Sequence, residues 1–109
     1  MKKLVFRNII ILFFLYSIPL IAQTNGQFKG FVKNASDYSP LAGAIIQLGG
    51  TNIQTTTDIN GYYKLEAPEG TYDIIVTHVG FEVYKLTFIL CEPSKKKVFN
   101  FYLIHGINW

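Results

Sequence analysis

Hydrophobic and polar residues alternate with a period of two along most of the chain after residue 27. In the segment 28–33, Phe28 and Val32 fall on one side, and Lys29 and Lys33 fall on the other. This period is typical of a β-strand with one buried and one solvated face. Similar apolar runs, separated by turn residues, follow at 43–48, 52–57, 62–66, 71–77, 81–90 and 98–103. The pattern predicts a strand in each segment and no helix.

Seven short strands separated by turns at intervals of about 8–12 residues are typical of a β-sandwich. We therefore predict an all-β fold, a seven-stranded antiparallel β-sandwich, with one core between its two sheets. The residues expected to point into that core are Phe28, Val32, Ala44, Ile46, Leu48, Tyr63, Leu65, Tyr72, Ile74, Val76, Phe99, Phe101 and Leu103.

The strongest turn signal is Asp58-Ile59-Asn60-Gly61, directly before the alternating run 62–66. Asn-Gly before such a run is a strong hairpin signal, because both residues tolerate positive φ. We predict a hairpin turn that Asp58 caps and in which Asn60 and Gly61 take positive φ values.

Other turns are predicted near two further glycines and a lysine run. Gly70 and Gly80 are expected to let the chain reverse at the edge of the sandwich. Lys95-Lys96-Lys97 is interpreted as a solvated turn whose charge discourages edge-to-edge pairing of strands.

The first 22 residues differ in composition from the rest of the chain. Lys2, Lys3 and Arg7 precede an apolar stretch that ends at Ala22, a small residue suited to cleavage by signal peptidase. The alternative is a retained membrane anchor, but an anchor needs about 20 apolar residues and roughly 14 follow Arg7. We predict that residues 1–22 are a secretory signal peptide and that the mature chain is exported.

Composition limits the chain to one domain, since it has 109 residues, 50% of them hydrophobic and 16% charged. The formal charge of +3 comes from the three basic residues before residue 8, so the remaining chain is neutral. A neutral body has no general attraction for nucleic acid or anionic lipid. The single cysteine, Cys91, cannot form an internal disulfide, and we expect it to be a small buried hydrophobe rather than a reactive thiol.

The order of the turn and core residues resembles the carboxypeptidase-regulatory-like domain, a transthyretin-like (prealbumin-like) sandwich. The resemblance implies a domain at residues 23–104, with residues 105–109 as a tail or truncated linker. The segments that carry it are Gly30-Phe31-Val32, Pro40-Leu41-Ala42-Gly43-Ala44, Gly50-Thr51, Thr57-Asp58-Ile59-Asn60-Gly61-Tyr62-Tyr63, Pro68-Glu69-Gly70-Thr71-Tyr72 and Val79-Gly80-Phe81.

This version of the domain is similar to the N-terminal extension of TonB-dependent outer-membrane receptors of the SusC/RagA kind. The resemblance implies a non-enzymatic interaction module of the cell envelope, in the periplasm or on the periplasmic side of the outer membrane. The sequence given stops at Trp109 without a plug, a barrel or a TonB box, so a truncated or a stand-alone module is expected. The alternative is an independent secreted β-sandwich that binds carbohydrate or protein.

The sequence argues against enzyme chemistry. The two histidines, His78 and His105, lie on different segments, and no metal-ligand spacing accompanies them. A calcium loop at Asp58 fails because Tyr62 occupies a position that needs an oxygen ligand. The chain also lacks the Tyr-Arg-Gly-Ser ending of transthyretin-like hydrolases. We expect no catalytic residue, no cofactor and no metal.

Exposed aromatic side chains are the remaining candidates for ligand binding, because they can stack on the faces of sugar rings. A tyrosine on a solvated sheet face is also simply a good strand former. The expected partner is an envelope protein or a glycan, with no nucleic acid and no membrane span after signal cleavage. The candidate stacking residues are Tyr62, Tyr38, Tyr84 and Trp109.

Overall fold

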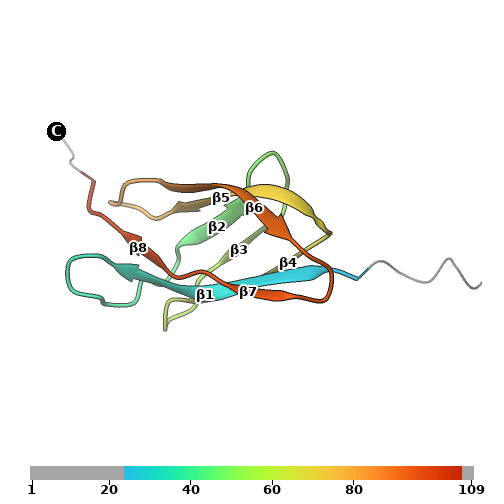
Figure 1. Cartoon of the computed structure of the whole chain (residues 1–109). Helices are drawn as coiled ribbons and strands as arrows, with labels where there is room; N and C mark the ends of the chain where they lie inside the picture. The colour runs from blue at the N-terminus through green and yellow to red at the C-terminus, as the bar shows by residue number, and fades with distance from the viewer. Residues whose placement is uncertain (1–23, 107–109) are drawn as a thin grey trace, which may run out of the picture.

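The computed structural model describes residues 24–106, which form two β-sheets packed face to face (Figure 1). This part of the chain contains no helix long and apolar enough to cross a membrane. The predicted all-β sandwich is confirmed, whereas the predicted signal peptide at 1–22 lies outside the described residues. The strands are β1 (Gly26–Asn34), β2 (Ile45–Leu48), β3 (Gln54–Thr56), β4 (Tyr62–Ala67), β5 (Gly70–Thr77), β6 (Tyr84–Cys91), β7 (Lys96–Val98) and β8 (Phe101–Leu103).

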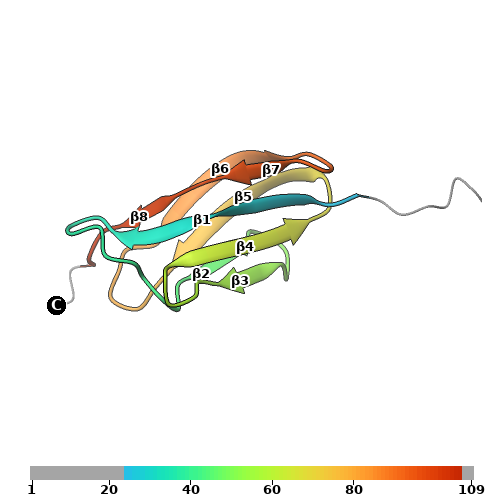
Figure 2. The same cartoon turned by 90° about the horizontal axis from the view of Figure 1, so that it is seen from below.

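The first sheet is built around β1, which lies between β4 and the β7–β8 segment (Figure 2). β4 pairs antiparallel with β1, from Gly26 opposite Ala67 to Phe31 opposite Tyr62. β7 and β8 pair with the other edge of β1 in parallel. The prediction of a purely antiparallel sandwich is therefore wrong at this edge, because alternation indicates the buried face of a strand but not its neighbours.

The last predicted strand, 98–103, is two strands, so the described chain has eight strands rather than seven. Between β7 and β8, Asn100 Oδ1 accepts a hydrogen bond from the Phe31 N–H at 3.0 Å. The break lies against Gly30, where a Cβ atom would overlap the Phe99 carbonyl oxygen. A side-chain amide thus replaces the backbone acceptor of a continuous strand, and alternation alone does not reveal such a replacement.

The lysine run does not form the predicted turn. Lys96 and Lys97 belong to β7, where Lys96 lies opposite Gln27 on β1. Only Lys95 stays in the loop before the strand. The prediction was wrong because β1 offers these lysines backbone partners that the local sequence does not indicate.

The second sheet has the order β3-β2-β5-β6 and is antiparallel throughout. The register of β5 and β6 shifts between Tyr72 and Ile74. Opposite this shift, Phe88 has a φ of 57° and donates its N–H to Asp73 Oδ1 at 3.2 Å. The irregularity leaves the Phe88 side chain exposed on the edge strand, as bulges at sheet edges commonly do.

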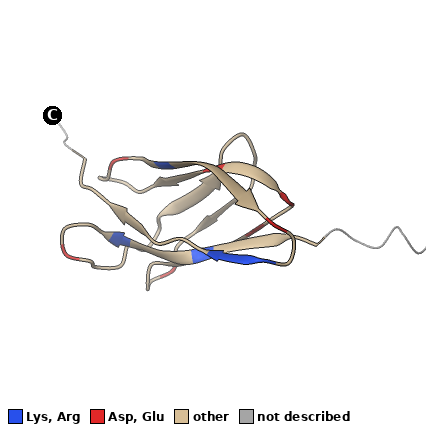
Figure 3. Ribbon diagram, viewed as in Figure 1, with Lys and Arg blue, Asp and Glu red and all other residues tan. Residues whose placement is uncertain are grey.

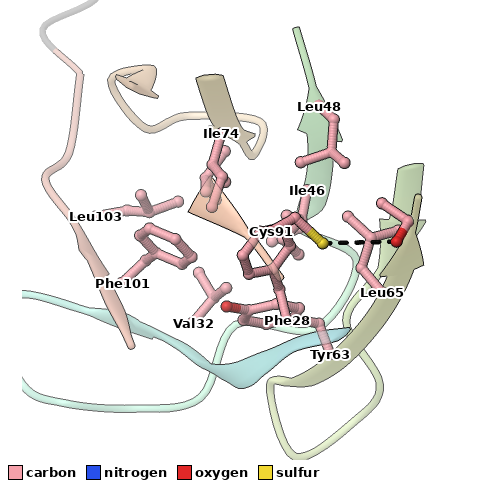
Figure 4. Packing of buried hydrophobic residues seen from close by; sticks show 13 residues of the cluster. Phe28, Val32, Ile46, Leu48, Tyr63, Leu65, Ile74, Cys91, Phe101 and Leu103 are labelled. Carbon is pink, nitrogen blue, oxygen red and sulfur yellow. Dashed lines mark hydrogen bonds between the residues drawn. The ribbon is translucent and has the colours of Figure 1, made fainter. Parts of the chain in front are cut away.

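The core lies between the two sheets and uses the predicted apolar positions (Figure 4). Of the predicted inward residues, Tyr72 and Phe99 are partly buried against the core and the others are fully buried. The Tyr63 hydroxyl donates to the Phe99 carbonyl oxygen at 2.8 Å, and burial raises the pKa of this phenol. The buried residues are Phe28, Val32, Ala44, Ile46, Leu48, Tyr63, Leu65, Ala67, Ile74, Val76, Cys91, Phe101 and Leu103.

The predicted tight turn at 58–61 forms and connects the two sheets. The Gly61 N–H donates to the Asp58 carbonyl oxygen at 2.9 Å, and the Asp58 N–H donates to the Tyr62 carbonyl oxygen at 3.0 Å. The flanking strands do not pair with each other as a hairpin would require, because β3 pairs with β2 and β4 pairs with β1. Asp58 Oδ1 accepts hydrogen bonds from the N–H groups of Asn60 at 2.9 Å and Tyr62 at 3.0 Å. Gly61 has a φ of 76°, but Asn60 is not among the described residues with positive φ. Asp at the first and Gly at the fourth position suit a type I turn, whose two central residues have negative φ.

The other two predicted turn glycines differ in backbone conformation. Gly70 has a φ of 157° and is the first residue of β5, directly after the turn. Gly80 has a φ of 85° and lies in a turn that is closed by the Phe81 N–H and the His78 carbonyl oxygen at 3.1 Å.

Candidate functional site

The structure places three of the four candidate stacking residues. Tyr62 is the first residue of β4, Tyr38 lies in the loop after β1, and Tyr84 is the first residue of β6. Trp109 lies outside the described residues. Tyr62 and Tyr38 belong to the first sheet and its loop, whereas Tyr84 belongs to the edge of the second sheet.

Tyr62 forms an aromatic pair on the outer side of the first sheet. It lies directly opposite Phe31 on β1, and the ring centroids are 5.5 Å apart in an edge-to-face arrangement. The neighbouring residues Val32 and Tyr63 point into the core, so alternation turns Tyr62 and Phe31 outward. Lys33 Nζ lies 5.6 Å from the centroid of the Phe31 ring, within the range of a cation–π contact.

Tyr38 forms a second aromatic pair at the end of the same sheet. Its ring meets that of Tyr102 on β8 at 5.7 Å with an interplanar angle of 89°. Tyr102 lies opposite Lys33 in the parallel pairing of β8 with β1. The two aromatic pairs are therefore joined through Lys33, which contacts Phe31 and lies beside Tyr102.

Short-range hydrogen bonds fix the loop that carries Tyr38. Tyr38 has a φ of 60°, and its N–H donates to the Asn34 carbonyl oxygen at 2.8 Å. Asp37 Oδ1 accepts bonds from the backbone N–H of Ser39 at 3.0 Å and from its hydroxyl at 2.7 Å. The Ser39 N–H lowers the pKa of the Asp37 carboxyl. This loop holds an exposed tyrosine in a left-handed conformation that an isolated residue would avoid.

Lysines share the outer side of the first sheet with the aromatic pairs. Lys29 lies directly opposite Lys64 on β4 and, on its other side, opposite Val98 on β7. We call this surface the lysine–aromatic face; it comprises Lys29, Phe31, Lys33, Tyr38, Tyr62, Lys64, Lys96 and Tyr102.

A hollow of about 200 Å³ lies between the beginning of β6 and the end of β8. Tyr84 lines it, and its ring meets the core residue Phe101 edge-on at 5.4 Å. The Glu82 N–H donates to the Ile104 carbonyl oxygen at 2.8 Å and joins the two walls at one end. Its lining residues are Glu82, Val83, Tyr84, Tyr102, Leu103 and Ile104.

Sequence reasoning missed Phe31, Tyr102 and the lysines as site residues. Alternation already placed Lys29 and Lys33 on the solvated side of the first strand. Alternation also placed Tyr102 on the solvated face, since its neighbours Phe101 and Leu103 point inward. The missing information was the register, which brings residues far apart in the sequence into one row across β4, β1 and β8.

The two histidines both contact Phe81. The His78 ring lies edge-to-face to it at 5.3 Å, and the His105 ring stacks on it at 4.4 Å. The His78 ring nitrogens lie 3.0 Å from the Val79 carbonyl oxygen and 2.8 Å from that of Ala42. Within residues 24–106, no group of three or more His, Cys, Asp or Glu side chains could hold a metal ion.

Several solved structures share the fold at low sequence identity. One is a chain of a type II cohesin–X–dockerin complex from Acetivibrio cellulolyticus, with a TM-score of 0.62 and 20% identity, covering 74% of this chain and 58% of that chain. A candidate carbohydrate-binding protein from Bacteroides uniformis gives a TM-score of 0.57 and 16% identity, covering 72% of this chain and 41% of that one. The minor pilin of Streptococcus agalactiae gives a TM-score of 0.54 and 17% identity, covering 81% of this chain and 48% of that one.

These similarities show the fold alone, and this chain spans less than two thirds of each of those structures. No curated protein matches the chain in sequence. The sequence profile of the CarboxypepD_reg-like domain matches residues 28–104, which include all the strands of the sandwich except the first two residues of β1. The chain belongs to the CarboxypepD_reg-like domain family.

Proposed function

We propose that this chain is a non-enzymatic interaction module of the cell envelope. The observation that carries the proposal is the lysine–aromatic face. Its aromatic rings lie on the solvated side of a sheet whose other side forms the core, so these rings are not part of the core packing. Clusters of exposed aromatic side chains with a polar surround mark interaction surfaces on soluble domains.

The described part of the chain supports binding rather than catalysis. The His78 ring nitrogens have backbone partners, and His105 Nε2 lies 3.4 Å from Asn34 Nδ2. The Cys91 thiol is buried, and burial raises its pKa, which disfavours the nucleophilic thiolate. The histidines and the cysteine are thus engaged in contacts within the fold, whereas the exposed aromatic and lysine side chains are free to contact a partner.

More specifically, we propose that the module is the N-terminal extension of a TonB-dependent outer-membrane receptor of the SusC/RagA kind. Family membership and the predicted signal peptide support this form, which would act on the periplasmic side of the outer membrane. The second candidate is an independent secreted domain that binds carbohydrate or protein. The two exposed aromatic pairs favour this second form.

Fractionation of the source cells separates the two forms. An antibody raised against residues 23–109 is used to probe periplasmic, outer-membrane and cytoplasmic fractions. A band in the outer membrane that is many times larger than the chain supports the receptor form. A small soluble periplasmic band supports the independent domain. Detection in the cytoplasm alone contradicts both.

Site-specific photo-crosslinking tests the interaction surface itself. A photoreactive phenylalanine analogue replaces Tyr102 on the first sheet or, as the control, Thr56 on the outer side of the second sheet. Both positions are exposed at sheet edges, so they sample solvent similarly. We expect envelope adducts from position 102 and few from position 56. Equal adducts from both positions would contradict a specific surface on the first sheet.

A further inference from the structure

Charge is segregated on a domain that is neutral as a whole. Residues 24–106 contain seven lysines and seven acidic residues. The outer side of the first sheet has four of these lysines, Lys29, Lys33, Lys64 and Lys96, and one acidic strand residue, Glu66, so its local charge is +3. Figure 3 shows the basic positions along β1 and β7, while most acidic positions lie in loops.

None of the four lysines has an ion-pair partner among residues 24–106. The described ion pairs use the other three lysines: Lys85 with Asp73, and Lys95 and Lys97 with Glu92. Lys29 and Lys64 instead lie directly opposite each other across β1 and β4. Like charges in such a pair are destabilising, and an anion bound over them would remove that cost.

The aromatic pairs lie on the same face at a spacing set by the strand. Phe31 is two residues from Lys29 and two from Lys33, so each lysine is about 7 Å along the strand from the aromatic row. Lys33 lies between the Phe31–Tyr62 pair and the Tyr102–Tyr38 pair. Cations and ring faces therefore alternate along β1.

We propose that the lysine–aromatic face binds an acidic polysaccharide, whose sugar rings pack on the two aromatic pairs and whose carboxylates pair with Lys29, Lys33 and Lys64. A neutral glycan would leave the Lys29–Lys64 repulsion in place. A polyanion without rings would leave the aromatic pairs exposed. A ligand with both rings and negative charges satisfies both features of the face.

This inference rests on the proposed function, because it gives the interaction surface a ligand class. Its test uses the chain expressed from Met1 and exported by the host, with its final N-terminus identified by mass spectrometry. The probes are polygalacturonate oligosaccharides, the same oligosaccharides after reduction of their carboxyl groups, and poly-glutamate of similar charge. Calorimetric titration at low ionic strength should give binding to polygalacturonate, with weaker binding at physiological salt because screening acts on exposed charges.

A charge-matched pair of variants locates the site. Removing the three cations by Lys29→Gln, Lys33→Gln and Lys64→Gln should weaken polygalacturonate binding about tenfold or more, since each exposed ion pair contributes modestly. Removing the three ion-paired lysines by Lys85→Gln, Lys95→Gln and Lys97→Gln changes the net charge equally and should change the affinity by less than about twofold. Thermal unfolding confirms that both variants fold.

A ring variant separates stacking from charge. Tyr102→Ala removes one ring of the Tyr38–Tyr102 pair. It should weaken polygalacturonate binding about fivefold or more without changing the net charge. Equal affinity for poly-glutamate, or equal losses in the two lysine variants, would overturn the proposal in favour of nonspecific attraction. Binding to anionic vesicles without binding to polygalacturonate would overturn it in favour of a membrane surface.

The outcome also distinguishes this inference from the proposed function. If no acidic oligosaccharide binds but crosslinks from position 102 persist, the inference fails and the interaction module stands, with a protein as its partner. If neither binding nor crosslinking is found, both fail.

Discussion

Gly30 lies where β1 closely approaches the segment between β7 and β8. A Cβ atom there would overlap the Phe99 carbonyl oxygen and lie 2.7 Å from its carbon and 2.9 Å from Asn100 Oδ1. Gly30→Ala should therefore force the β7–β8 segment away from β1. We expect a loss of about 1–3 kcal/mol, or a melting temperature lower by roughly 4–8 °C per kcal/mol.

Gly49→Ala is the matched control, because the nearest atoms to its Cβ, on Asp73 and Ile75, are 3.4 Å away at ordinary contact distance. Scanning calorimetry of both variants measures the difference. Equal melting temperatures for the two alanine variants would contradict the close packing at Gly30.

Cys91 gives a second residue-level prediction. Its side chain is 1% exposed, and its Sγ lies 3.5 Å from the Ala67 carbonyl oxygen (Figure 4). Because burial also raises the thiol pKa, the native protein should react with a thiol reagent at least about a hundredfold more slowly than the chain in denaturant. Absorbance of the released chromophore follows the reaction. Comparable rates in both states would show that the thiol is accessible.

At the level of elements, Asn100 lies at the break between β7 and β8 and bonds to β1. Its Oδ1 accepts the Phe31 N–H at the break, so Asn100→Ala leaves this amide without its acceptor. We expect a loss of about 0.5–1.5 kcal/mol and faster hydrogen exchange at Phe31. The Val32 amide, bonded to the Gly61 carbonyl oxygen at 2.8 Å, is the internal control. Equal acceleration at both amides would indicate global unfolding instead of local loss.

The same elements show which structural information is local. Alternation predicted the buried faces of β1, β2 and β4 because the pleat turns successive side chains to opposite sides. It did not predict the parallel partner of β1, since pairing depends on residues some seventy positions away. The turn at 58–61 illustrates the same limit: Asp58 and Gly61 indicate a chain reversal, but the sheet that each flanking strand joins is set by distant partners.

The candidate site was predictable only in part for the same reason. The sequence predicts Tyr62 and Tyr38 as exposed aromatic residues, and the structure brings them to one sheet face. Tyr84 lies instead at the hollow beside β8. The balance of seven lysines and seven acids argues against a general attraction for polyanions, yet composition has no information about where each charge lies. The pairing register of β4, β1 and β7 gathers the lysines on the outer side of the first sheet, and this register is set only when the chain folds.

At the scale of the whole molecule, this charge balance predicts acid sensitivity. Protonating the seven carboxyl groups leaves the seven lysines of residues 24–106 without opposing charge, and self-repulsion then destabilises the compact state. Hydrogen bonds from Lys95 and Lys97 lower the pKa of the Glu92 carboxyl below its usual 4.5. A depressed folded-state pKa means that this stabilisation is present above the usual value and is lost as the pH falls through the folded pKa.

Glu92→Gln isolates the contribution of this carboxylate from the general repulsion. At about pH 7 the variant should melt slightly below the parent protein, because Lys95 and Lys97 lose their charged partner. The two melting temperatures should converge as the pH falls below the usual carboxyl value of 4.5 and through the lowered folded-state pKa of Glu92, because the parent carboxylate then becomes protonated. Added salt should raise the acid melting temperature of both proteins, since it screens the remaining lysine repulsion. A difference that stays constant with pH would mean that Glu92 acts through packing rather than through its charge.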